Sequence, residues 1–101
     1  MDNPDVAYLS MPEEYLGNEA YIRIKMQEEG MDDPSLVRER INHNTTAVYC
    51  QWGPKKFGLR YTHNNESEYW EYMYRARMAV LRAVYKHVTG REFRGRNNEM
   101  A

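Results

Sequence analysis

Residues 65–90 restrict the fold of this chain more than any other segment, because they predict a single long helix. Asn65 and Glu68 have the spacing of a capping box, in which two side chains satisfy free backbone amides at the start of a helix. Gly90 follows the unbroken helical pattern, at the position where glycine commonly ends a helix. We therefore expect a helix of about six or seven turns, at roughly 3.6 residues per turn.

The predicted helix is apolar around much of its circumference, more than a helix that covers one face of a sheet requires. Its central apolar face and its two flanks contain Tyr69, Met73, Val80, Val84, Val88, Trp70, Tyr74, Leu81, Tyr85, Tyr72, Ala76 and Ala83. Because one small sheet cannot cover this surface, we expect another chain to bury some of its large side chains. The expected partner or oligomer interface consists of Trp70, Tyr72, Tyr74, Met78 and Tyr85.

A β-hairpin is predicted just before this helix. Residues 46–52 and 57–63 are rich in β-forming side chains, and they flank the four-residue turn Gly53-Pro54-Lys55-Lys56. If Trp52 pairs with Phe57, alternate residues share a face. The expected core face is Val48, Cys50, Trp52, Phe57, Leu59 and Tyr61, and the expected water-facing side is Ala47, Tyr49, Gln51, Gly58, Arg60 and Thr62.

Residues 18–27 fit two interpretations. Every second residue from Ala20 to Met26 is apolar, which is the period of a half-buried strand. The residue types, together with a capping box formed by Ser10 and Glu13, favour a helix instead. We favour the strand.

Asp33 and Pro34 predict the start of a short amphipathic helix that ends near Asn42, because an acidic cap followed by proline is typical of helix starts. Together these elements predict an α+β fold with the order βαββα or ααββα. In this fold a small antiparallel or mixed sheet, with the hairpin at its centre, packs against the long C-terminal helix.

The 101 residues are enough for a single domain, and both ends, at residues 1–11 and 95–101, are expected to be frayed. A hydrophobic content of 42% excludes global disorder, and a net charge of −1 excludes a strongly basic nucleic-acid protein. No apolar run approaches the roughly 20 residues of a membrane span. Because the first residues are acidic, unlike a signal peptide, we expect a cytoplasmic protein that does not contact membranes.

The residue types that carry chemistry do not converge in this sequence. Cys50 and His63 share a hairpin face, but at a strand rise of about 3.3 Å per residue they lie roughly 13 Å apart, too far for a thiolate–imidazole pair. His43, His63 and His87 lack metal-ligand spacing, and there is no glycine-rich phosphate loop. We therefore expect a protein without enzymatic activity, metal or cofactor.

Nucleic-acid or nucleotide binding is the alternative interpretation. If residues 18–27 form a strand beside the hairpin, one sheet face gathers aromatic and basic side chains that can stack on bases and contact phosphates. This face would contain Tyr21, Arg23, Lys25, Tyr49 and Arg60. A basic strip on the C-terminal helix and tail would extend it through Arg75, Arg82, Lys86, Arg91 and Arg94.

Arg77 differs from the other basic residues because it lies inside the apolar stripe, between Met73 and Val80. A buried guanidinium requires a partner that compensates its charge. We expect a carboxylate from the N-terminal half of the chain to provide it, with a bound anion as the alternative.

The distribution of charge and of aromatic residues favours an interaction protein. Residues 1–44 hold ten acidic and four basic side chains, whereas residues 45–101 hold ten basic and five acidic ones, which suits a self-complementary dimer. Nine Tyr, seven Met and two Trp match the composition of protein interfaces. We expect a non-catalytic protein that binds a host or partner macromolecule as a homo-oligomer, similar in composition to small accessory or inhibitor proteins of bacteriophages and other mobile elements.

Overall fold

A computed structural model describes residues 13–32 and 34–94 of the chain. It contains two helices and one three-stranded antiparallel sheet with the strand order β1-β2-β3. The elements are α2 (Glu13–Glu28), β1 (Val37–Asn42), β2 (Thr45–Trp52), β3 (Lys55–Thr62) and α3 (Glu66–Thr89). The predicted frayed ends and the Ser10 half of the capping box lie outside the described residues.

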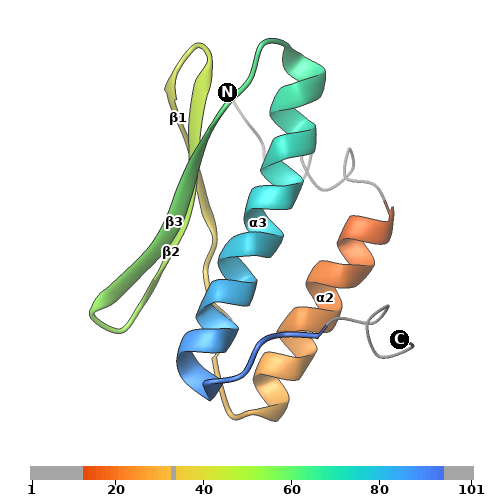
Figure 1. Cartoon of the computed structure of the whole chain (residues 1–101), viewed down its shortest axis with the longest axis vertical. Coiled ribbons are helices and arrows are strands. Elements are labelled where there is room, and N and C mark those ends of the chain that lie inside the picture. Colours follow the sequence, from red (N-terminus) through yellow and green to blue (C-terminus); the bar gives the residue numbers. More distant parts are fainter. Residues whose placement is uncertain (1–12, 33, 95–101) are drawn as a thin grey trace.

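The elements form three layers, with α3 in the middle (Figure 1). The sheet packs on one side of α3, mainly through β2 and β3, and α2 packs on the other side. The predicted α+β fold, with a hairpin and a long C-terminal helix on the sheet, is confirmed. The wide apolar surface of α3 is explained by this arrangement, because two layers of the same chain cover it.

The long helix begins and ends where the sequence predicts. The side-chain oxygen of Asn65 accepts a hydrogen bond of 2.9 Å from the backbone amide of Glu68. The Glu68 carboxylate in turn accepts a bond of 3.0 Å from the backbone amide of Asn64. At the other end, Gly90 has a φ of 75°, a left-handed conformation that glycine adopts without steric strain.

The preferred strand interpretation of residues 18–27 is wrong, because these residues form the greater part of α2. Glu19, Ile22 and Met26 are buried at helical spacing, whereas Ile24 is half exposed. A buried carboxylate therefore occupies one of the inward positions of the helix. The helical spacing of the buried residues was not recognised in the sequence, because a hydrophobicity pattern assigns Glu19 to the surface.

The short helix predicted from Asp33 to Asn42 is also wrong, because residues 37–42 form strand β1. This strand pairs with β2 from Val37 opposite Tyr49 to Asn42 opposite Thr45. Pairing with the hairpin outweighs the local helix-start signal. Over residues 13–32 and 34–94 the element order is therefore αβββα, which differs from both predicted orders, βαββα and ααββα.

The predicted hairpin is present, with a tighter turn than expected. Trp52 pairs with Lys55 rather than with Phe57, so the turn consists of Gly53 and Pro54 alone. Gly53 has a φ of 60°, which this tight turn requires at its first central residue. A register shift of two residues leaves each side chain on its predicted face, because the strand period is two.

The core lies on both sides of α3. Its fully buried side chains come from α2, β2 and α3 and are Ile22, Met26, Val48, Thr46, Cys50, Tyr69, Met73, Leu81 and Val84. Trp52, Phe57 and Tyr61 pack against this cluster from the hairpin, as the predicted core face requires. Leu59 is the exception on that face, since it is 37% exposed.

A buried ion pair attaches α2 to α3. The Arg77 guanidinium donates two hydrogen bonds to the Glu19 carboxylate, at 3.1 Å from Nε and 2.8 Å from one terminal nitrogen. Only 4% of the Glu19 side chain and 13% of the Arg77 side chain are exposed. The predicted internal pair between Arg77 and an acid of the N-terminal half is therefore confirmed.

Replacing Glu19 by Gln is expected to lower the free energy of unfolding by about 3 kcal/mol, because the Arg77 charge would lose its compensating partner in a buried site. Urea denaturation followed by circular dichroism measures this difference. Replacing both Glu19 and Arg77 by Met is expected to restore most of the loss.

The matched control is Glu28→Gln, which removes the exposed pair between Lys25 and Glu28. It is expected to change the free energy of unfolding by less than about 0.5 kcal/mol. An equal effect of Glu19→Gln and Glu28→Gln would contradict the structural role of the buried pair.

Candidate binding surface

One side of the sheet is not covered by any described helix. Because α3 occupies the opposite side, the alternation of side chains leaves a surface that we call the outer face. It consists of Val37, Glu39, Ile41, Ala47, Tyr49, Lys56, Gly58 and Arg60. Three strands contribute to it, and the chain folds them as neighbours through two tight turns.

Tyr49 lies across the centre of the outer face. Its hydroxyl donates a long hydrogen bond of 3.4 Å to the Glu39 carboxylate on β1. On the other side, the Lys56 ammonium on β3 lies 4.1 Å from the centroid of the Tyr49 ring, a cation–π contact. The phenol ring thus spans from β1 to β3 and is held at both ends.

Gly58 makes this position of Tyr49 sterically accessible. It lies directly opposite Tyr49 in the hairpin. A Cβ atom at position 58 would be 2.6 Å from the Tyr49 Cβ and 3.0 Å from the Val48 carbonyl oxygen, closer than such atoms approach without displacement. The absence of a side chain at Gly58 therefore allows the two strands to pair closely under the ring.

The outer face is a shallow hollow with an apolar centre and a charged border. The hollow has a volume of about 360 Å³. Val37 and Ile41 expose 41% and 42% of their surfaces beside it. Glu39 borders it on β1, and Lys56 and Arg60 border it on β3. Apolar side chains surrounded by charges are the arrangement found in protein interfaces.

The predicted basic and aromatic sheet platform does not form. Tyr21, Arg23 and Lys25 lie on α2, which α3 separates from the sheet. Only Tyr49 and Arg60 remain on the outer face, and they do not pair, because Gly58 is opposite Tyr49 and Ala47 is opposite Arg60. The platform required residues 18–27 to be a strand, and their helical conformation removes it.

The predicted basic strip on α3 is largely neutralised by acids of the same chain. Arg75 pairs with Glu71 at 2.8 Å, and Lys86 pairs with Glu92 at 2.6 Å. Arg91 pairs with Glu29 of the segment after α2. Arg82 and Arg94 are exposed, and the Arg82 guanidinium carbon lies 5.8 Å from the Phe93 ring. Three of the five cations of this strip therefore already have a carboxylate partner.

The residues predicted to form a partner or oligomer interface separate into two groups. Tyr74 and Tyr85 are buried in the core of the single chain, between α3 and its two neighbouring layers. Trp70, Tyr72 and Met78 are half buried. Aromatic contacts within the chain take up much of their surface, since Trp70 packs against Tyr69 and Tyr74.

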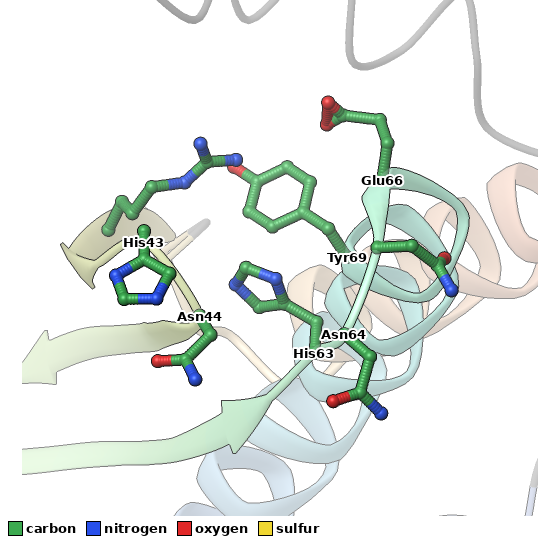
Figure 2. A pocket seen from close by; sticks show the side chains of 8 residues that line it. His43, Asn44, His63, Asn64, Glu66 and Tyr69 are labelled. Atoms are coloured by element: carbon green, nitrogen blue, oxygen red, sulfur yellow. The ribbon is translucent and has the colours of Figure 1, made fainter.

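A second hollow lies at the end of the sheet, between the β1–β2 turn and the start of α3 (Figure 2). It has a volume of about 290 Å³, and its lining consists of Arg40, His43, Asn44, His63, Asn64, Asn65, Glu66 and Tyr69. His63 is buried there and its Nε2 lies 3.0 Å from the Thr46 hydroxyl. Within the described ranges, no three His, Cys, Asp or Glu side chains are arranged to hold a metal ion.

Cys50 is a buried core residue on β2 rather than an accessible nucleophile. Only 1% of its surface is exposed. Burial raises the pKa of the Cys50 thiol, and the opposing charge of Arg23 has a smaller effect. A thiol with a raised pKa is a poor nucleophile, because the thiolate is the reactive form.

Comparisons with protein-family models, curated proteins and solved structures find no match to this chain. None of the helices that the structure describes is long and apolar enough to cross a membrane. The surfaces of the molecule are therefore the basis for a functional proposal.

The part of the outer face that β1 forms was not predicted from the sequence. Val37, Glu39 and Ile41 belong to β1, which was predicted to be a helix because Asp33-Pro34 is typical of a helix start. An available signal was the alternation of these residues with Arg38 and Arg40. This alternation predicts a strand only if arginine is accepted on the side of the sheet that faces α3. In the structure the guanidinium carbon of Arg38 lies 5.3 Å from the Trp70 ring centroid, and that of Arg40 lies 4.3 Å from the Tyr69 ring centroid.

Gly58→Ala is expected to destabilise the protein by about 1–3 kcal/mol, because the added methyl group overlaps the Tyr49 Cβ. Thermal unfolding measures the change, and Arg60→Ala, an exposed position on the same strand, provides the control. A neutral Gly58→Ala variant would show that Tyr49 is not held against β3.

Cys50 is expected to resist thiol reagents in the folded protein, because it is buried and its pKa is raised. Reaction with a chromogenic disulfide at pH 8 is expected to be at least a hundredfold slower in buffer than in 8 M urea. Comparable rates in the two solutions would contradict the buried position.

Proposed function

We propose that this protein is a non-catalytic binding protein that acts by covering part of the surface of another protein with the outer face of its sheet. The observation that supports this proposal best is the exposed apolar surface of the outer face: Val37 lies opposite Tyr49, Ile41 lies further along β1, and charged side chains border the hollow. An apolar hollow with a charged border is stabilised when a partner of complementary shape excludes water from it.

A protein partner agrees better with this surface than a nucleic acid. Glu39 lies within the outer face, where it would repel phosphates. Tyr49 is the aromatic side chain of this face, and its hydroxyl and ring already contact Glu39 and Lys56. A surface that stacks several bases needs successive free aromatic rings and a continuous cationic groove.

The biological setting of this binding protein is a separate part of the proposal. Its small size and its Tyr and Met content suit an accessory or inhibitor protein of a phage or other mobile element that binds a host protein. Self-association also remains a prediction. Since Tyr74 and Tyr85 are buried within one chain, the outer face is a more suitable contact between two copies than the residues selected from the sequence.

Ile41→Asp is expected to weaken the binding of a partner at least tenfold, because it replaces one of the exposed apolar side chains of the outer face by a charge. Partners are first captured on the tagged wild-type protein from nuclease-treated lysate of the source cells. The affinity of the purified partner for the wild type and for Ile41→Asp is then measured. A tenfold loss corresponds to about 1.4 kcal/mol.

Ile24→Asp is the matched control, because Ile24 is 51% exposed on α2, on the far side of α3 from the sheet. It is expected to change the affinity less than twofold. Equal losses in the two variants would contradict recognition by the outer face. Partners that disappear after nuclease treatment would favour nucleic-acid binding instead.

A further inference from the structure

The two edges of the sheet differ in regularity. Strand β1 has six residues, and its register with β2 shifts between Arg40 and Asn42. Such irregularities protect an edge from pairing with other chains. Strand β3 has eight residues, no proline, and an unbroken register from Thr62 opposite Thr45 to Lys55 opposite Trp52. The regular edge is therefore the one suited to pairing.

The outer edge of β3 is open in the part of the chain that the structure describes. Strand β3 is the last strand of the sheet, and it contacts β2 on one edge and α3 on one face. No described element lies alongside its other edge (Figure 1). An open edge presents a row of backbone amides and carbonyls that a further extended chain can satisfy.

Strand β3 also carries a local excess of positive charge. Lys55, Lys56 and Arg60 are exposed, and β3 contains no acidic residue. Lys55 lies over the Phe57 ring and Lys56 over the Tyr49 ring. No carboxylate among the described residues pairs with these three cations. By contrast, Arg23, Lys25, Arg75, Arg77, Lys86 and Arg91 all have carboxylate partners.

The alternation along β3 specifies what a docked strand requires. Lys56 and Arg60 point to the outer face, so acidic residues at every second position of the docked strand would lie beside them. On the opposite face, Phe57 is half buried and Leu59 is 37% exposed. Apolar residues at the intervening positions would cover these two side chains.

We propose that the open edge of β3 binds an extended segment of a partner protein in which acidic and apolar residues alternate. This inference rests on the proposed function and specifies how the partner is recognised. Main-chain hydrogen bonds supply the common part of such binding, and the cations supply its selectivity. A second copy of β3 suits this edge less well, because Lys56 and Arg60 of the two copies would gather on the same face.

The experiment uses two capped synthetic peptides, one of four Glu-Val repeats and one of four Lys-Val repeats, titrated into the full chain labelled with ¹⁵N at low salt. The Glu-Val peptide is expected to shift the backbone amide signals of β3, to slow hydrogen exchange there, and to bind at least tenfold more tightly than the Lys-Val peptide. Unchanged β3 signals, or equal binding of the two peptides, would overturn the proposal.

The double substitution Lys56→Glu/Arg60→Glu is expected to reverse the preference between the two peptides. The control Arg82→Glu/Arg94→Glu makes the same change of charge away from β3 and is expected to keep the preference. The amide spectrum of each variant establishes that it is folded. Identical preferences in the two double variants would overturn the role of the β3 cations.

The outcomes also separate this inference from the proposed function. If Ile41→Asp abolishes the binding of the natural partner while the Glu-Val peptide leaves β3 unchanged, the outer face is the binding surface and the strand-addition mode is wrong. If the peptide binds β3 and Ile41→Asp has no effect on the natural partner, the edge binds extended chains and recognition by the outer face is wrong. If a single-stranded oligonucleotide displaces the peptide from β3, the proposal of an acidic protein segment is wrong and a nucleic acid is the better candidate for this edge.

Discussion

The rest of the structure depends on the cover of α3 by two layers, and the ion pair between Glu19 and Arg77 is buried in the contact with the second layer. A helix with apolar side chains on most of its surface needs cover on two sides, and the sheet supplies only one. The buried carboxylate contacts α3 near the middle of both helices, and the pair of Glu29 with Arg91 joins the segments that follow them. The opposite charges of the two halves of the chain, which suggested contact between two molecules, are thus used within one molecule.

The sequence predicted the elements whose local signals agree with their environment. The caps at Asn65 and Gly90 and the hairpin are correct, because hydrogen bonding and strand alternation act over a few residues. The partner of Arg77 is distant in the sequence, and its prediction rests instead on the need of a buried guanidinium for a carboxylate. Even the error of two residues in the hairpin register left the faces intact. The fold class could therefore be predicted from residues 45–90 alone.

The errors share one physical cause, which is that charged side chains occupy inward positions. Glu19 faces the core from α2, and Arg38 and Arg40 face α3 from β1, where they lie over aromatic rings. Patterns of hydrophobicity assign such residues to the surface. Residues 18–27 were therefore predicted as a strand and residues 37–42 as a helix, each the reverse of what the structure shows. For this reason the sequence did not predict the β1 part of the outer face, whereas it assigned Tyr49 and Arg60 of the hairpin to the correct face.

The middle position of α3 has a consequence for how this protein can change over time. Most of the tightly packed side chains lie on the two sides of α3, whereas the outer face borders the core through one layer of strands. Substitutions at Val37, Ile41 or Arg60 can therefore change the outer face at little cost to folding. Gly58 and Tyr49 are the exceptions, because a side chain at position 58 would overlap the Tyr49 Cβ. A lineage of such chains can thus vary the chemistry of its outer face while the contacts between its helices stay the same.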